Sequence, residues 1–593
     1  MAIRGNNGDQ AMVVLLEAAT RKLLSRALIG GKDELQWFRW AGNNRLLLSV
    51  SSVGLFYETE MRFTRLLSYD LPSRTFTVIG DRKQGGSIGD DLLYVDPAGQ
   101  FVLLAIQRTI FDWPSVWRFS LNAGEDKQAK QVQPSKDSVW DWYADDAGTV
   151  RMGLDYTRGR LKVWYRKAPE GDLEMVVKIN KDDADDKIWD VARLFANTDE
   201  GYVIDRAGET MALRTFNYAT RTAGEIIYQN LDWDLTEADM GADGKPSAVY
   251  FTNDKDRVVW LDPRMKAIQA RLERALPGSD VWVISRARDD SRMLVYSGRE
   301  DDPGALYVFT VATRSLEFVA NYRPAIDPRE LATPKPVSYV ARDRTLIRGY
   351  LTLPRGREAR NLPLIILPHG GPYGVRDSLA YDDEVQFLAN RGYAVLQPNF
   401  RGSGGFGEAF ENIGDGEIGR KMQDDLDDGM DWLVRQGIAD AGRVCVVGAS
   451  YGGYAALWSV IRNPERYRCA ASFAGVTDWK KQLSYSNRGF DSNSRKDWTN
   501  TVIGDVKDFN LDTISPSRQA ARLTRPVLLA HGEKDSRVPF SHFKSMRDAA
   551  ARAKVPIELL VFKEAGHGFD KPADEQRWYE TLEAFLTKNN PAD

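Results

Sequence analysis

Short apolar segments in which hydrophobic and polar side chains alternate make up the first 320 residues, and clusters of Gly, Asp, Asn and Pro separate them. Examples are 101–106 (FVLLAI), 139–144 (VWDWYA) and 305–320 (ALYVFTVATRSLEFVA). Alternation with a period of two predicts β-strands. Because this stretch shows no sustained helical periodicity, we expect it to form an all-β region.

Polar turns recur through this region at intervals of 45 to 56 residues, and each is followed by an apolar strand. A period of this length holding four strands is typical of a β-propeller blade. The regular spacing favours a propeller over an array of β-sandwiches. The turns are marked by Asn43, Gly99, Gly148, Asp199, Gly244 and Ser291.

The first residues are similar to the second half of a blade, because 3–24 resembles 295–318. Six full turns plus this partial unit predict seven blades, with the first blade incomplete at the N-terminus. We hypothesise that the native N-terminus was trimmed, together with a signal peptide. A gene-level sequence that begins at Met1 would contradict this hypothesis.

Tryptophans gather at the start of the predicted blades, just before or within the innermost strands. We expect these large rings to pack between blades. Stacking on nucleic-acid bases is the alternative, but no basic groove accompanies them. The residues are Trp37, Trp40, Trp140, Trp142, Trp189, Trp233 and Trp282.

The pattern changes after the Pro-rich segment 321–336, which we interpret as a linker. From Val337 onward, continuous apolar strands alternate with amphipathic helices. Such strands indicate a mostly parallel, doubly wound sheet that helices cover on both faces. We therefore predict a propeller over 1–325 and an α/β-hydrolase domain over 326–593.

One predicted strand, RVCVVG, leads through Gly448-Ala449-Ser450-Tyr451-Gly452 into a predicted helix. This is the G-x-S-x-G nucleophile elbow in its strand–turn–helix context. The tight turn exposes the serine hydroxyl, and the flanking glycines let the two backbones approach. Ser450 is therefore the candidate nucleophile.

A nucleophilic serine needs a base, and the base needs a carboxylate that orients it. In this fold class the acid and then the histidine follow the serine. Asp535 and His567 each follow a predicted strand, so they are the candidates. We interpret His531 as a structural residue of its loop and His542 as solvated helix surface, while His369 precedes the serine.

The oxyanion hole needs two N–H donors. One is expected from the backbone of Tyr451, directly after the nucleophile. The sequence His369-Gly370-Gly371-Pro372 follows an earlier strand and is of the HGGG type, so we assign the second donor to the backbone around Gly371.

Composition narrows the remaining possibilities. Eighty Lys and Arg against 84 Asp and Glu leave a net charge of −4, which argues against nucleic acid as the main partner. Two cysteines, Cys445 and Cys469, rule out a disulfide framework and a four-thiolate metal site. They look unpaired and fit either a cytoplasm or a bacterial periplasm.

No apolar run is long enough for a transmembrane helix, and MAIRGNNGDQ lacks the apolar core of a secretory signal.

A propeller followed by a Ser–Asp–His hydrolase domain resembles the prolyl oligopeptidase family of serine peptidases. The motifs GYLTLP, PHGGP, NFRGSGGFG, GASYGGY, HGEKDSRVP and GHGF stand in order across 337–593. The PHGGP and GASYGGY motifs look most like the acylaminoacyl-peptidase and dipeptidyl-peptidase branches. The HGGP sequence also favours a backbone oxyanion donor over the tyrosine hydroxyl of prolyl oligopeptidase itself.

The resemblance implies further roles. Arg537 matches a position that binds a substrate backbone carbonyl, while Tyr451, Val476, Trp479 and Val538 match positions that line the pocket before the scissile bond. Family members use the propeller to restrict access to short peptides. No metal or cofactor is implied, and a homo-oligomer is left open.

Three questions stay open on sequence grounds. An esterase or thioesterase could use the same triad, and a non-catalytic propeller scaffold is a third alternative. Exopeptidase and endopeptidase activity are not distinguished. A dipeptidyl peptidase needs propeller carboxylates for the substrate ammonium, for which Glu58 and Glu60 are candidates.

Overall fold

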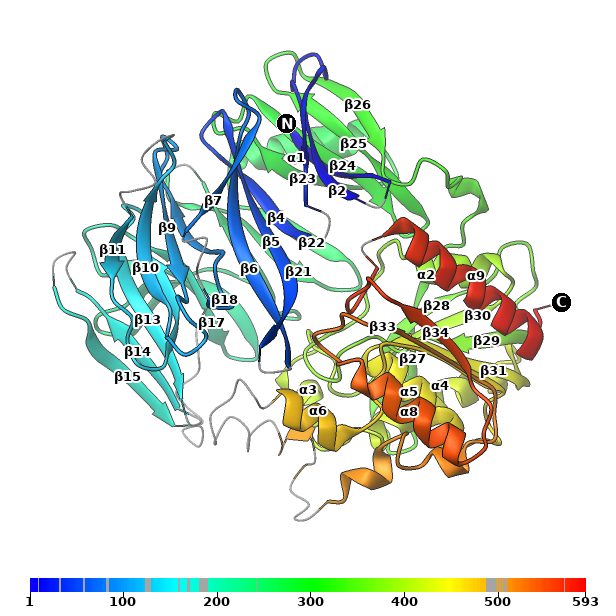
Figure 1. Ribbon diagram of the computed structural model, residues 1–593. Coiled ribbons are helices and arrows are strands. Elements are labelled where there is room, and N and C mark those ends of the chain that lie inside the picture. Colours follow the sequence, from blue (N-terminus) through cyan, green and yellow to red (C-terminus); the bar gives the residue numbers. More distant parts are fainter. Residues whose placement is uncertain are drawn as a thin grey trace.

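The computed structural model of the chain consists of a propeller beside an α/β domain (Figure 1). It describes residues 1–593 except 9, 31–32, 57–58, 81–84, 123–128, 158–159, 168–170, 181–189, 242, 487–498, 500, 503, 505–508, 570 and 593. Trp189 and Glu58 therefore lie outside the described residues, as does the side chain of Glu60.

Seven antiparallel sheets follow one another along the first part of the chain and form the seven predicted blades. In the second to seventh blades, the six predicted polar turns each join the first two strands. The first four blades comprise β1 (Ala2–Asn7), β2 (Gln10–Leu16) and β3 (Leu23–Leu28); β4 (Glu34–Ala41), β5 (Arg45–Phe56), β6 (Thr59–Asp70) and β7 (Thr75–Ile79); β8 (Asp91–Val95), β9 (Phe101–Ile106), β10 (Ser115–Ser120) and β11 (Lys130–Gln133); and β12 (Val139–Ala144), β13 (Val150–Thr157), β14 (Arg160–Tyr165) and β15 (Glu174–Asn180).

Of the last three blades, the fifth and the seventh have a fourth, outer strand, and the sixth has three strands among the described residues. They comprise β16 (Asp190–Leu194), β17 (Glu200–Ala207), β18 (Thr210–Asn217) and β19 (Thr222–Gln229); β20 (Leu235–Met240), β21 (Pro246–Thr252) and β22 (Asp256–Trp260); and β23 (Asp280–Arg286), β24 (Arg292–Arg299), β25 (Asp302–Thr310) and β26 (Ser315–Asn321). Within the described residues the first and sixth sheets have three strands each.

The sixth blade contains a helix that the strand pattern did not predict, α1 (Pro263–Ala275). Its start is locally encoded, because the Asp262 carboxylate accepts hydrogen bonds from two N–H groups of the first turn and Pro263 occupies the first helical position. Met265, Ile268 and Leu272 form its buried face. The expectation of β structure throughout 1–320 was therefore wrong at this segment.

Apolar side chains between successive blades hold the propeller together. Six separate clusters form, one for each pair of neighbours from the first blade to the seventh. Trp142, for example, packs with Leu103 of the preceding blade, and Trp37 and Trp40 contact two other clusters. For these residues, packing between blades is as predicted.

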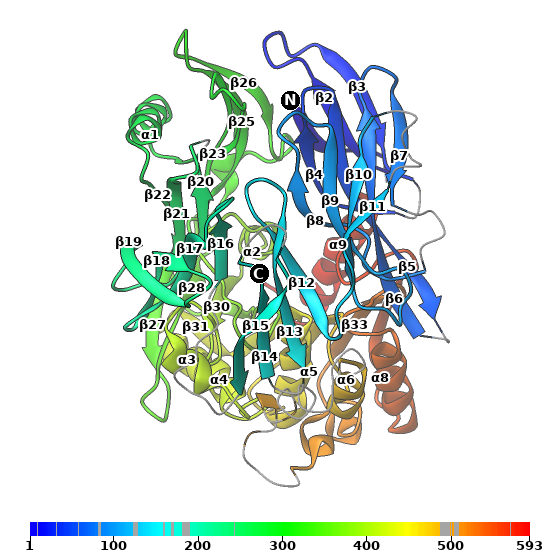
Figure 2. The same cartoon turned by 90° about the vertical axis from the view of Figure 1, so that its left-hand side faces the viewer.

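The seventh and first blades meet differently. Among the described residues no buried apolar cluster spans them, and Arg21 joins them instead. Its guanidinium donates to the Phe318 carbonyl at 2.8 Å and lies 3.0 Å from Glu317. The view turned by 90° shows the strands of both blades at the same end of the molecule (Figure 2).

The α/β domain contains one eight-stranded sheet in the order β27-β28-β30-β29-β31-β32-β33-β34, and the last six strands in this order are parallel. The strands are β27 (Lys335–Val340), β28 (Leu346–Thr352), β29 (Leu362–Ile366), β30 (Ala394–Asn399), β31 (Ala439–Ala449), β32 (Cys469–Phe473), β33 (Val527–Gly532) and β34 (Glu558–Phe562). The predicted boundary near residue 325 falls between β26 and β27. The doubly wound fold is confirmed.

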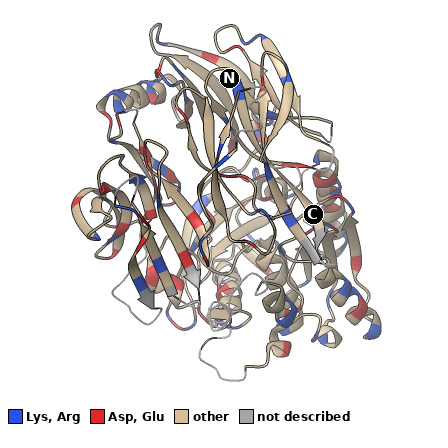
Figure 3. Ribbon diagram, turned by 60° about the vertical axis from the view of Figure 1, so that its left-hand side comes forward, with Lys and Arg blue, Asp and Glu red and all other residues tan. Residues whose placement is uncertain are grey.

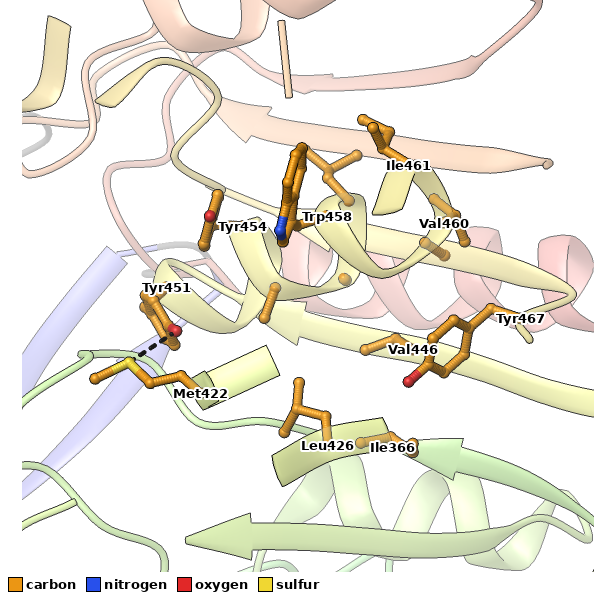
Figure 4. Close-up of a cluster of buried hydrophobic side chains, with 14 of the residues drawn as sticks. Ile366, Met422, Leu426, Val446, Tyr451, Tyr454, Trp458, Val460, Ile461 and Tyr467 are labelled. Atoms are coloured by element: carbon orange, nitrogen blue, oxygen red, sulfur yellow. Dashed lines mark hydrogen bonds between the residues drawn. The ribbon is translucent and has the colours of Figure 1, made fainter. Parts of the chain in front are cut away.

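Helices cover both faces of this sheet, as its continuous apolar strands require. Leu388 of α2 and Leu582 of α9 pack on one face. Leu426 of α4, Leu457 of α5 and Phe543 of α8 pack on the other, and Figure 4 shows part of this second cluster, including Leu426. The helices are α2 (Asp383–Asn390), α3 (Glu408–Asn412), α4 (Lys421–Arg435), α5 (Tyr451–Arg462), α6 (Trp479–Ser486), α8 (Ser541–Arg552) and α9 (Pro572–Asn589), with short 3-10 turns at Pro328–Glu330, Leu511–Ile514 and Ala520–Arg522.

The two cysteines are paired, which corrects the expectation that they are free. Cys445 of β31 and Cys469 of β32 are register partners in neighbouring parallel strands and form a disulfide. Both side chains are fully buried. A separation of 24 residues does not reveal a strand register, so the sequence alone could not predict this contact.

Charged residues are interspersed over both regions (Figure 3). In the part of the chain that the structure describes, none of the helices has the length and apolar character needed to cross a membrane.

Candidate active site

Ser450 lies at the end of β31, on the turn that starts α5. Its backbone has φ 59° and ψ −120°, a strained conformation for a residue with a side chain. Its N–H donates to the Phe473 carbonyl of β32 at 2.9 Å, which anchors the turn to the neighbouring strand. The strain and the position at a helix N-terminus are those of a nucleophile elbow.

Close backbone packing around Ser450 depends on glycines. A β-carbon at Gly452 would lie 2.1 Å from the Pro368 carbonyl oxygen, and one at Gly453 would lie 2.8 Å from that of Phe473. The loop after β29 therefore packs directly against the elbow. A β-carbon at Gly370 would lie 3.3 Å from that of Ser450, so the predicted oxyanion loop lies beside the serine.

Gly371 follows with φ +84°, a conformation that favours glycine. His369 precedes it and is buried, with Nε2 at 3.0 Å from the Ser403 hydroxyl and its ring stacked on Phe400. Burial lowers the pKa of His369 to about 4, so the ring is neutral near pH 7. It supports the loop rather than acting as a base.

Asp535 and His567 are brought together from the loops after β33 and β34. The Asp535 Oδ2 atom lies 2.7 Å from His567 Nδ1, and Asp535 Oδ1 accepts the backbone N–H groups of Arg537 and Val538 at 2.8 and 2.9 Å. Asp535 is fully buried, whereas His567 is partly exposed.

The electrostatics of this pair favour an ionised carboxylate. Burial by itself raises the pKa of Asp535, but the side-chain interactions with His531 and His567 outweigh it and hold this pKa well below its usual range. The carboxylate is thus positioned to orient His567 and to stabilise its protonated form.

The structure does not join Ser450 to His567 by a hydrogen bond. Among the described residues the Ser450 hydroxyl has no hydrogen-bond partner, while its backbone is fixed at both ends by bonds to Phe473 and Tyr454. Catalytic hydrogen bonds often close only when substrate binds.

The other two histidines are both buried. His531 Nε2 donates to the Val538 carbonyl at 2.8 Å and lies 3.4 Å from Asp535 Oδ2, in agreement with a structural role in the loop. His542 was expected at the surface, but its side chain is 1% exposed and its Nδ1 accepts the Thr477 N–H at 3.1 Å. Burial lowers the pKa of His542 to about 3, so this ring is neutral.

The predicted pocket residues lie in one buried cluster, formed by Tyr451, Val476, Trp479 and Val538 together with neighbouring core residues. The Tyr451 hydroxyl points to the Met422 sulfur at 3.2 Å, away from the turn that carries its N–H (Figure 4). Arg537 is exposed on the loop that carries Asp535.

Sequence reasoning did not find one acidic residue near the site, Glu34. It starts β4 of the second blade, and its Oε1 atom would lie 3.5 Å from a β-carbon at Gly566, next to His567. Arg62 lies 3.0 Å from Glu34 Oε2. The local sequence around Glu34 gives no indication of this position, because the contact with Gly566 joins residues from the two domains.

The fold, the strained serine and the Asp–His pair define the class: a propeller-bearing α/β-hydrolase of the serine-hydrolase type. Residues 379–591 match the prolyl oligopeptidase family. The chain is 30% identical to dipeptidyl aminopeptidase BIII of Pseudoxanthomonas mexicana over 515 residues, which cover 82% of this chain and 71% of the relative. The protein belongs to the prolyl oligopeptidase family and is a serine peptidase.

A second relative and a solved structure are also similar to this chain. Acylamino-acid-releasing enzyme 1 of Oryza sativa subsp. japonica is 29% identical over 242 residues, which cover 39% of this chain and 30% of the relative. The puromycin-hydrolysing peptidase of Mycobacterium tuberculosis has the same fold, with a TM-score of 0.73 at 19% identity, over 98% of this chain and 91% of that one.

Proposed function

We propose that the peptidase reaction runs on a triad of Ser450, Asp535 and His567. The observation that carries this proposal is the 2.7 Å contact between Asp535 and His567, both in loops at the edge of the sheet where β31 presents the strained Ser450. In parallel α/β sheets the carboxyl ends of the strands meet at the edge where active sites gather.

The mechanism follows from these positions. His567 takes the proton of the Ser450 hydroxyl as its oxygen attacks the peptide carbonyl, and Asp535 stabilises the resulting imidazolium. The N–H of Tyr451 and the backbone around Gly371 bind the tetrahedral oxyanion. His567 then protonates the leaving amine, and water hydrolyses the acyl-enzyme through the same residues in reverse.

Substrate binding is assigned to the walls around the serine. We propose that Val476, Trp479, Val538 and the ring of Tyr451 form an apolar pocket for the residue before the scissile bond, and that Arg537 binds a substrate carbonyl. Arg537 fits this role because it is exposed directly beside the catalytic loop. That nucleic acid is not the main partner stays a prediction from the sequence, and a homo-oligomer stays an open possibility.

The test of the triad is covalent labelling with a fluorophosphonate. Wild-type protein is expected to react at one serine, and Ser450→Ala to lose both the label and all peptide turnover. Ser545→Ala, in α8, where the hydroxyl donates to the Ser541 carbonyl, is the matched control and should keep both. Labelling that survives Ser450→Ala would contradict the assignment, and an unlabelled wild type would favour the non-catalytic scaffold.

The esterase alternative is tested by comparing the hydrolysis of amide and ester substrates. Peptide p-nitroanilides and p-nitrophenyl esters should be compared in parallel on the same preparation. We expect appreciable amide hydrolysis, because the relatives are named peptidases. Ester hydrolysis with negligible amide hydrolysis would overturn the choice.

We further propose that the enzyme removes short units from peptides with a free N-terminus, and that Glu34 binds the substrate ammonium. Two observations support this: the Glu34 carboxylate lies near Gly566 in the His567 loop, and the relative with 30% identity is a dipeptidyl aminopeptidase. A carboxylate that hydrogen-bonds an ammonium contributes about 1.5–3 kcal/mol.

Paired peptides with free and acetylated N-termini test this second proposal. Glu34→Gln should lower kcat/KM about ten- to a hundredfold for the free peptide and leave the acetylated peptide unaffected. Glu200→Gln, an exposed acid of the fifth blade that pairs with Asn217, is the control. An equal loss for both peptides would contradict the role of Glu34.

A further inference from the structure

The candidate oxyanion loop continues directly into a segment that contacts the propeller. The loop begins after β29 at His369, and only a few residues later the Leu379 N–H donates to the Asp254 carbonyl at 2.6 Å. Asp254 lies in the turn between β21 and β22 of the sixth blade. One short stretch of chain therefore joins the reaction centre to the other domain.

Arg376 makes the main contact of this segment. Its Nη2 donates to the Asn253 carbonyl of the same propeller turn at 2.6 Å and to the Tyr350 hydroxyl at 3.2 Å. The guanidinium lies 4.0 Å from the centre of the Phe406 ring and 5.8 Å from that of Trp233, a propeller residue. Two aromatic faces from different domains thus hold one cation.

The residues between Gly371 and Arg376 have little freedom to absorb a displacement. The Gly374 N–H donates to the Gly402 carbonyl at 3.0 Å, and the Gly404 N–H donates to the Val375 carbonyl at 3.1 Å. Beyond Arg376, the fully buried Asn399 accepts the Asp377 N–H at 2.7 Å. Arg376 and Gly371 therefore belong to one short stretch of backbone whose hydrogen bonds define its path.

We propose that Arg376 is a positioning residue that couples docking of the propeller to the geometry of the oxyanion hole. The inference rests on the proposed function, since it assumes that the backbone around Gly371 binds the oxyanion. It assigns to the sixth blade, through Asn253 and Trp233, a part in the chemical step in addition to restricting access. Misplacing a donor by about 1 Å is sufficient to cost up to about a hundredfold in rate.

The test compares Arg376→Met with Arg206→Met in the full-length chain. Arg206 of β17 also joins the propeller to the catalytic domain, at 3.6 Å from Glu408 of α3, but is not bonded to the loop. Arg376→Met should lower kcat for a peptide p-nitroanilide at least about tenfold, with KM within about twofold. Inhibition by a peptide boronic acid, whose serine adduct mimics the tetrahedral intermediate, should weaken by a similar factor. Arg206→Met should change neither.

A second variant changes the propeller side of the contact between Arg376 and Trp233. Trp233→Leu removes one aromatic face and is expected to lower kcat in the same direction by a smaller factor, and Arg376→Lys should recover part of the loss. A change in KM without a change in kcat, or equal effects of Arg376→Met and Arg206→Met, would overturn the inference. Failure of the proposed function is distinguishable, because wild-type Ser450 would then not react with the fluorophosphonate.

Discussion

The propeller and the catalytic domain bury their apolar side chains in different ways. In the propeller, each cluster joins only two neighbouring blades, as Trp142 of the fourth blade does with Leu103 of the third. In the catalytic domain, one continuous cluster runs along a face of the sheet and includes residues of α4, α5 and α8. Damage inside a blade that does not contact the catalytic domain should therefore stay local, whereas damage to the core of the catalytic domain should reach the site.

The largest expected effect comes from two buried aspartates, one in each region. Asp535→Asn should lower kcat about 10⁴-fold, because an amide in place of the carboxylate favours the wrong tautomer of His567. Asp155→Asn, at a fully buried propeller residue that lies 2.7 Å from Lys162, should lower stability and leave kcat unchanged. Steady-state kinetics on both variants checks this difference.

A strong loss of kcat in Asp155→Asn would contradict this comparison, since it would mean that the propeller interior affects the chemistry without a contact to the site.

The dependence of protein stability on pH gives a second test of Asp535. Because the pKa of Asp535 is held well below its usual range, its contribution to stability is present above the unfolded pKa. That contribution should persist at pH 4 and vanish only at more acidic pH.

The next effect uses two buried tryptophans with equivalent hydrogen bonds. In the propeller, Trp142 donates to the Pro114 carbonyl at 3.0 Å. In the catalytic domain, Trp458 of α5 donates to the Gly419 carbonyl at 2.9 Å. Replacing either by Ala should destabilise its domain by about 3–5 kcal/mol. Denaturant unfolding measures both changes.

Their effects on activity should differ, because α5 begins at the residue after the nucleophile and Trp458 packs in the cluster of Figure 4. Trp458→Ala should lower kcat, and Trp142→Ala should not. Trp→Phe at each position serves as the milder control if the Ala variants do not fold. Equal loss of activity in the two variants would contradict the local character of the propeller.

The smallest effect concerns two half-buried acids, one in each region. Burial, together with the neighbouring Asp141 and Asp90, raises the pKa of Asp91 in β8 to about 7, and burial with Asp382 raises the pKa of Glu384 in α2 to about 7. Between about pH 4 and pH 7 the folded chain then binds more protons than the unfolded chain, so stability falls as pH rises.

Asp91→Asn and Glu384→Gln remove the titrating carboxyls, and with them the decrease in stability between about pH 4 and pH 7. Each should stabilise the protein by about 1 kcal/mol at pH 8 and by close to nothing at pH 4. Thermal unfolding at the two pH values checks the sign. A stabilisation that is the same at both pH values would show that titration of these carboxyls is not the cause.

Much of the architecture could be predicted from local signals. The turn spacing located the first hairpin of six blades, and the G-x-S-x-G sequence located the strained turn at Ser450. The helix α1 was missed although its start is encoded by Asp262 and Pro263, because the repeat favoured a strand at that point. The local sequence therefore contained the helix start, but the repeat pattern was given more weight than these two residues.

Other features had no local signal. His542 lies on an amphipathic helix whose polar face looked solvated, yet packing of α8 against the segment around Thr477 buries it. The approach of Glu34 to Gly566 and the bond from Arg376 to Asn253 each join the two domains. Contacts between residues hundreds of positions apart depend on how the domains dock.

The sequence by itself predicted the order of most elements and the strained turn that carries Ser450, and it singled out His567 as the candidate base. These follow from periodicity and steric limits that act within a few residues. Only the tertiary structure decided that Cys445 pairs with Cys469, that Asp535 reaches His567, and that Arg376, a few residues after the candidate oxyanion loop, bonds to the propeller. Those contacts depend on strand register and domain docking, which are set by the packing of the whole chain.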